Sequence, residues 1–228
     1  MNSTKAHFLV TIGLLFIATM GSALPVNATP VPIGNSSFET PEITGFEYVP
    51  LGASWSFTMP AIGGGAGISH PPSGFGGTPA PDGNQYAFLQ LTGSFFQSIA
   101  FPADGTYVLT FFAAGRTDNG FGARGDQTYR VLLDSAVIFA GSTTSSSAFN
   151  AQQSAPFLAT GGAHTLTFEG LKDFVTFGDQ TAFIDAIAIN SLVVPTPSPS
   201  VPEPSALLLL SLGVAGLAAI RRRRFITG

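Results

Sequence analysis

Short apolar and β-branched runs recur along the middle of the chain, and turn residues separate them. Leu166 and Phe168 alternate with polar residues, which is the period-2 pattern of a strand with one buried face. In Ala182–Ile189 both sets of alternate positions are largely apolar, so we expect this strand at the centre of a sheet. Helical periodicity is nearly absent between residues 29 and 194.

This patterning predicts an antiparallel arrangement of short strands. The expected strands are Ser54–Thr58, Tyr86–Leu91, Phe95–Ala100, Thr106–Ala113, Thr128–Asp134, Ala136–Ala140, Gln153–Leu158, His164–Glu169 and Ala182–Ile189. Asp134-Ser135 and Gly161-Gly162 are expected as turns. Pro60–Pro81 and Gly115–Asp126 are expected as surface loops, the first being either a binding loop or a spacer. Without crossover helices, such strands predict an all-β fold, an antiparallel β-sandwich.

The amino-terminal apolar segment has the layout of a secretory signal. Lys5 precedes the apolar run Phe8–Met20, and small residues follow it. We expect a signal helix within residues 1–28, with cleavage after Ala28 or, as second choice, after Ala23. The alternative is an amino-terminal membrane anchor, but the run is shorter than the ~20 residues of a typical span. The secretory translocon and signal peptidase are the partners that this prediction implies.

The carboxyl-terminal apolar segment predicts a transmembrane helix with a defined direction. A helix over the 16 residues of 205–220 is about 24 Å long, somewhat short of a hydrocarbon core of about 30 Å. It spans the core if flanking side chains reach outward or the bilayer thins. Four arginines follow it: Arg221, Arg222, Arg223 and Arg224. Because each guanidinium is costly to move through lipid, residues 221–228 form a basic cytoplasmic tail and the preceding chain lies outside.

A proline-rich stalk, residues 195–204, precedes this helix and ends in Pro202-Glu203-Pro204. The order of this motif, the apolar helix and the arginine cluster resembles the PEP-CTERM sorting signal of Gram-negative bacteria. The resemblance covers about the last 25 residues of the chain. It implies recognition by exosortase, a membrane-embedded cysteine transpeptidase-like enzyme, and removal of the tail during sorting to the envelope or exterior. It explains where the protein goes and not what it does there.

Charge and cysteine content exclude several classes of function. Between Thr29 and Ser200 four basic residues stand against twelve acidic ones, so the exported part carries a net charge of −8. Such a surface repels polyanions, and we expect no binding to nucleic acid. The chain contains no cysteine, which excludes disulfides, thiolate metal sites and a cysteine nucleophile.

The exported segment also resembles a known module. The residues that carry the resemblance are Asn35-Ser36-Ser37-Phe38-Glu39, Trp55, Pro81–Leu89, Gly105–Phe111 and Phe183–Ile187. Together they resemble the galactose-binding-like jelly roll of carbohydrate-binding modules, which implies a jelly-roll sandwich over residues 29–194. In such modules a structural calcium often joins the first and last strands, which here implies Glu39 and Asp185 as ligands. The chain departs from the pattern at Ala186, where a second acidic residue is common.

Each of these site predictions has a structural alternative. Asp185 is either a calcium ligand or a hydrogen-bonded polar residue at a strand edge. Trp55 and Tyr86 are candidate platforms for a saccharide, but both lie in strand-like runs, where packing in the core is the alternative. Gly120–Gly125 matches G-x-G-x-x-G, yet a strand-like run rather than a helix follows, so we interpret it as a chance match.

The sequence therefore favours a non-enzymatic protein of the cell surface or extracellular matrix, as in a biofilm. Catalytic motifs are missing, and only His70 and His164 remain after the signal is removed. We expect an inner-membrane-anchored precursor that exosortase processes for the envelope, the cell surface or the exterior. The alternative function is a lectin-like module that binds extracellular polysaccharide. No cofactor other than the possible calcium is expected.

Overall fold

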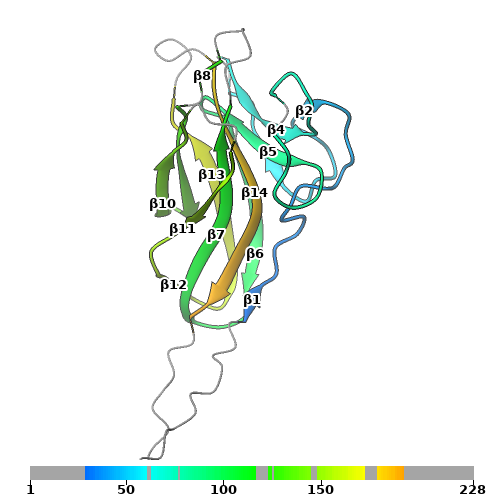
Figure 1. The fold of residues 1–228 in the computed structure, drawn as a ribbon. Helices are drawn as coiled ribbons and strands as arrows, with labels where there is room; N and C mark the ends of the chain where they lie inside the picture. The colour runs from blue at the N-terminus through cyan, green and yellow to red at the C-terminus, as the bar shows by residue number, and fades with distance from the viewer. Residues whose placement is uncertain are drawn as a thin grey trace, which may run out of the picture.

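The chain folds into two β-sheets that share one hydrophobic core (Figure 1). The computed structural model describes residues 29–60, 63–76, 78–116, 123–124, 126–144, 148–172 and 179–192. Within these ranges the secondary structure is strand only, with no helix. Successive strands cross repeatedly from one sheet to the other, as in a jelly roll. This confirms the prediction of an all-β antiparallel sandwich.

The larger sheet has the order β11-β7-β14-β5-β4-β2, with β1 and β8 pairing β14 and β12 pairing β7. The strands are β1 (Pro30–Val31), β2 (Phe46–Tyr48), β4 (Gly65–Ser69), β5 (Tyr86–Gln90), β7 (Gly105–Gly115), β8 (Ala123–Arg124), β11 (Asn150–Gln153), β12 (Phe157–Ala159) and β14 (Asp179–Ser191). The smaller sheet has the order β10-β9-β13-β6-β3. Its strands are β3 (Ser56–Phe57), β6 (Ser94–Phe101), β9 (Thr128–Leu133), β10 (Ala136–Ser142) and β13 (Gly162–Gly170). The main ladders are antiparallel; β8 alone among the described strands pairs in parallel.

Alternating side chains from both sheets fill the space between them. In β13, Leu166 and Phe168 are fully buried, as their alternation predicts. Phe168 stacks on Phe95 of the neighbouring strand at a ring-centroid distance of 5.0 Å and meets Phe111 of the opposite sheet edge-on at 5.3 Å. Such aromatic pairs contribute about 1 kcal/mol each beyond the area they bury.

A second apolar cluster covers the outer face of the larger sheet. Phe88 and Phe183 belong to this cluster and not to the main core. They are buried there, because Phe75 stacks on Phe88 with ring centroids 4.4 Å apart. β14 is therefore apolar on both faces and lies between β7 and β5. This confirms the prediction that Ala182–Ile189 belongs to a central strand.

One strand contradicts the prediction of a continuous loop over Pro60–Pro81. β4 pairs with β5 and β2, and all five of its residues are buried. Its glycines hid it, because glycine is depleted in strands. A Cβ on Gly67 would lie 2.0 Å from the carbonyl oxygen of Glu47 and 2.8 Å from the ring of Phe88, so the close approach of β2 requires glycine here.

The expected strand Gln153–Leu158 is interrupted and forms β11 and β12. Ser154 lies at the break, and its hydroxyl accepts a 3.0 Å hydrogen bond from the N–H of Leu109 in place of a main-chain acceptor. Pro156, which has no N–H to donate, follows. The turns at Asp134-Ser135 and at Gly161-Gly162 are where we predicted them, between β9 and β10 and between β12 and β13.

The predictions for the two ends of the chain lie outside the described residues. These are the signal peptide (1–28), the stalk (195–204), the transmembrane helix (205–220) and the basic tail (221–228). In the part of the chain that the structure describes, no helix has the length and hydrophobicity to cross a membrane.

Candidate functional site

Asp185 is buried at a bend in the central strand. The pairing of β14 with β7 shifts register between Asp185 and Ala188, and Ala186 has a positive φ of 50°. The bend lets the N–H of Ile187 donate to the carbonyl of Ser36, at 3.1 Å, so the first segment of the domain joins the last strand here. Both carboxylate oxygens of Asp185 accept main-chain hydrogen bonds, from Ala186 at 2.7 Å and from Asp82 at 3.0 Å.

Two more carboxylates lie in the same loop cluster. Oε1 of Glu39 accepts hydrogen bonds from the N–H groups of Asn84 and Gln85, at 2.9 and 2.8 Å. A Cβ on Gly83, whose φ is 82°, would lie 2.4 Å from the carboxyl carbon of Glu39, so the loop is shaped around this side chain. The hydroxyl of Ser37 donates to Asp82. The structure thus places Glu39 and Asp82 near Asp185. The resemblance implies Glu39 and Asp185 as calcium ligands, which stays a prediction, and Asp82 was not expected.

The electrostatics of this cluster favour a cation. Burial raises the pKa of Asp185 to about 7, the two main-chain hydrogen bonds oppose the rise, and the negative charges of Asp82 and Glu39 add to it. None of the ion pairs among the described residues involves Asp185. When it ionises, the carboxylate at the bend therefore has no described basic side chain to compensate its charge.

The donor set fits calcium in its chemistry, because calcium prefers hard carboxylate and carbonyl oxygens. The described residues include no group of three or more His, Asp or Glu side chains placed to hold a metal on their own. Glu39 and Asp185 would accordingly supply two carboxylates, and main-chain oxygens or water would complete the coordination.

Trp55 and Tyr86 are buried, which corrects their assignment as platforms for a saccharide. Trp55 is 4% exposed; it packs on Phe38 and Phe95, and its indole N–H donates to the carbonyl of Asn35 at 3.0 Å. Tyr86 is fully buried, and burial raises its pKa to about 12. Neither ring offers a face to a ligand, so the alternative of core packing holds for both.

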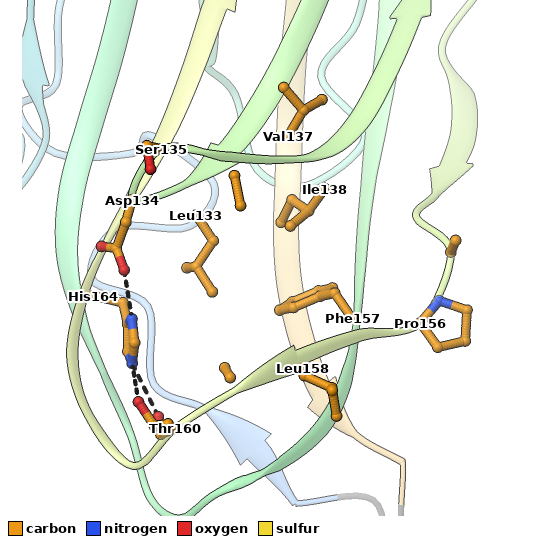
Figure 2. A pocket seen from close by; sticks show the side chains of 13 residues that line it. Leu133, Asp134, Ser135, Val137, Ile138, Pro156, Phe157, Leu158, Thr160 and His164 are labelled. Carbon is orange, nitrogen blue, oxygen red and sulfur yellow. Dashed lines mark hydrogen bonds and ion pairs between the residues drawn. The ribbon is translucent and has the colours of Figure 1, made fainter.

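A groove opens where the β9–β10 hairpin faces β12, at one edge of both sheets (Figure 2). Its volume is about 570 Å³. Apolar side chains line it from both sides: Leu133, Val137, Ile138, Phe157 and Leu158. Polar side chains gather at one end, which Figure 2 shows as a chain of hydrogen bonds from Asp134 through His164 to Thr160. The groove combines an apolar wall with a polar rim.

The polar rim joins two turns through one histidine. Nδ1 of His164 lies 2.8 Å from Oδ2 of Asp134, and Nε2 lies 3.0 Å from the carbonyl oxygen of Thr160 and 3.2 Å from its hydroxyl. The hydrogen bond with Asp134 raises the pKa of His164, and the N–H of Thr165 together with His164 lowers the pKa of Asp134. When the ring is protonated, Nε2 donates to the Thr160 carbonyl; when it is neutral with its proton on Nδ1, Nε2 accepts from the Thr160 hydroxyl. The trio therefore links the β9–β10 turn to the turn before β13.

The sequence left this groove unrecognised. Asp134 was visible only as a turn residue, and His164 only as one of two remaining histidines. Their meeting depends on the pairing of β13 with β9, in which Leu166 is the partner of Leu133. An Asp in a hairpin turn and a His at the start of a later strand were the available signals.

Comparison with protein families identifies the carboxyl terminus. The model of the PEP-CTERM protein-sorting motif matches residues 200–224, which include Pro202, Glu203, Pro204 and the arginines 221–224. The chain thus carries the sorting motif of proteins that are exported, held in the membrane and then processed by exosortase, which confirms the resemblance seen in the sequence. A search of curated protein sequences gives no match to the chain.

Comparison with solved structures supports the fold. A Stig cyclase from Fischerella sp. TAU, crystallised with an indole compound, has a TM-score of 0.54 at 18% identity, covering 72% of this chain and 98% of its own. A second cyclase structure from Fischerella sp. TAU gives 0.54 at 16% identity, with coverage of 74% and 100%. A family 35 carbohydrate-binding module from Clostridium thermocellum gives 0.43 at 13% identity, with coverage of 64% and 97%. At these identities the likeness to the two cyclase structures concerns the fold alone.

Proposed function

We propose that this chain is a non-enzymatic protein of the cell surface or extracellular matrix, whose mature part is the β-sandwich of residues 29–194. The sorting motif at residues 200–224 is the observation that carries the proposal, because this motif is the signal by which exosortase recognises an exported protein. The net charge of −8 on the exported part suits a hydrated envelope or matrix, where it limits non-specific aggregation.

The non-enzymatic character has its own support in the described residues. The one histidine that lies beside an acid and a hydroxyl, His164, has both ring nitrogens in hydrogen bonds, with Asp134 and with Thr160. The most strongly perturbed carboxyl, Asp185, is fully buried and bonded to main-chain N–H groups. Both groups are occupied by contacts within the fold.

Replacing Glu203 by Ala tests the sorting step. We expect this variant to accumulate as a membrane-bound precursor in the native host, whereas Glu47→Ala, an exposed acid in β2, leaves processing unchanged. Cell fractionation and mass spectrometry of both termini give the measurement. Normal processing of the Glu203 variant contradicts the role of exosortase.

The groove beside β10 supports a second candidate, the binding of an extracellular polysaccharide. Sugars bind where apolar surface lies next to polar groups that can pair with hydroxyls, and the groove offers Val137 and Leu158 next to Asp134. Glycan-array binding that falls at least tenfold in Asp134→Asn, but not in Glu47→Gln on the opposite edge, supports this function. Trp55→Ala is unsuited as a test because Trp55 lies in the core.

We also propose that Glu39 and Asp185 hold a structural calcium ion. The support is the convergence of negative charge around a buried carboxylate that lacks a described basic partner. The ion would tie the segment at Ser36 to the bend of β14 and so stabilise the closure of the sandwich.

A further inference from the structure

Three strands on one flank of the sandwich come from a segment without charged residues. From Ser135 to Ala163 the sequence contains no Asp, Glu, Lys, Arg or His. This stretch supplies β10, β11 and β12, which form the same edge of the two sheets (Figure 1). The exported part as a whole has a net charge of −8, so these strands are the uncharged part of an acidic body. Asp134 lies at the end of the groove, and Arg130, the partner of Ala140 in β9, forms an ion pair with Glu169.

The outermost strand on this flank has an unprotected edge. Among the described residues β10 pairs with β9 alone, so its other side presents backbone N–H and C=O groups. Charged residues and proline usually protect such edges, and β10, Ala-Val-Ile-Phe-Ala-Gly-Ser, has neither. Its bulge lies between Val137 and Phe139 and leaves Phe139–Ser142 in regular register. This half of the strand has the geometry to accept a further strand.

Apolar side chains flank the free edge. Val137 is 52% exposed and Leu158, across the groove, is 82% exposed. Figure 2 shows both at the groove, on the β10 and β12 sides respectively. Burying these side chains against a partner contributes about 25 cal/mol for each Å² removed from water. The flank therefore offers main-chain pairing and apolar contact together.

We propose that β10 is a self-association edge through which two copies of this chain pair. Charge favours a second copy of this chain as the partner. The acidic faces of two copies repel one another, whereas the strands without charged residues can approach without this repulsion. Antiparallel pairing of Phe139–Ser142 around a two-fold axis places the Asp134 end of one strand beside the Ser142 end of the other, so the two Asp134 carboxylates do not face each other. The inference stands independently of the sorting proposal and of polysaccharide binding.

Thiol cross-linking of the full chain in membranes tests this directly, because the chain has no cysteine of its own. The test variant is Ala140→Cys, an exposed position in the regular half of β10; the control is Ser56→Cys, an exposed position in β3 at the opposite edge of the same sheet. With a short bismaleimide we expect at least tenfold more dimer from Ala140→Cys. Association through the carboxyl-terminal segment alone would cross-link both variants equally and would overturn the proposal.

A charge placed on the edge provides the second arm. Val137→Lys, added to Ala140→Cys, should reduce the dimer at least fivefold, while Leu51→Lys, at a side chain 85% exposed in a loop, should not. Thermal melting followed by circular dichroism shows whether each variant is folded. If Val137→Lys does not fold, the comparison of Ala140→Cys with Ser56→Cys alone tests the proposal. Equal reduction by both lysines would contradict pairing at β10. Raising the salt concentration should increase the dimer, since it screens the acidic bodies.

Discussion

We predict that the buried carboxyl of Asp185 makes the stability of this protein depend on pH and, through the proposed metal site, on calcium. In the folded chain its pKa is raised to about 7 from an ordinary value of 3.8. An acid whose pKa is higher in the folded state binds its proton more tightly there. The contribution of Asp185 to the free energy of unfolding is therefore largest below about pH 4. It is lost as the pH rises towards 7. The difference of about three pKa units corresponds to about 4 kcal/mol over the whole interval.

Urea denaturation in the presence of a chelator measures this loss. Between pH 5 and pH 8 we expect the free energy of unfolding to fall by about 3 kcal/mol through Asp185. Fluorescence of Trp55, the single tryptophan and 4% exposed, reports unfolding. The raised pKa of His164 acts in the same direction, because its contribution is present below its unfolded pKa and lost as pH rises through the folded one. The experiment therefore uses a His164→Gln background.

Calcium and a matched variant separate the possible causes. Calcium favours the ionised carboxylate, so adding it should flatten the pH dependence and raise the melting temperature at pH 8. Asp185→Asn should remove both the slope and the calcium effect, whereas Asp104→Asn, at an aspartate that caps Gly161, should keep both. An equal slope in Asp185→Asn and its parent refutes the reasoning about burial. A melting temperature that does not respond to calcium or chelator refutes the calcium proposal and leaves the pH argument intact.

Three further changes test the packing. Gly67→Ala should destabilise the protein by about 3 kcal/mol or more, because the new Cβ would lie 2.0 Å from the carbonyl oxygen of Glu47. Chemical denaturation measures this loss. A midpoint close to that of the parent would contradict the need for glycine in β4. Trp55→Ala should lower the free energy of unfolding by about 3–5 kcal/mol, because it leaves a cavity in the core. Denaturation followed by far-ultraviolet circular dichroism measures the loss. A loss below about 1 kcal/mol would indicate a surface position instead. Ser154→Ala should lower the free energy of unfolding by about 1–3 kcal/mol, because the buried N–H of Leu109 loses its acceptor. The amide hydrogen of Leu109 should then exchange faster with solvent. Unchanged protection of this amide would show that the Ser154 hydroxyl is not its acceptor.

Local patterns in the sequence determined the strands with a clear apolar alternation and the sorting motif. The alternation in β13 and the apolar character of both faces of β14 follow from which residues must leave water, and the structure places both as expected. The Pro-Glu-Pro motif, the apolar segment and the arginine cluster are contiguous, so a family model recognises them without any fold. Properties that depend on neighbours along the chain could be predicted in this way.

The tertiary structure decided whatever depends on residues far apart in sequence. β4 is a strand because β2 and β5 lie on either side of it, although its glycines argue against one. Trp55 is core because Phe38 and Phe95 cover it, and Asp185 meets Asp82 because β14 bends at Ala186. Strand pairing and register set these contacts. The single sequence contains the apolar pattern of each strand but does not show which strand pairs with which. For the same reason the groove and the neutral edge of β10 became visible only once both sheets were in place.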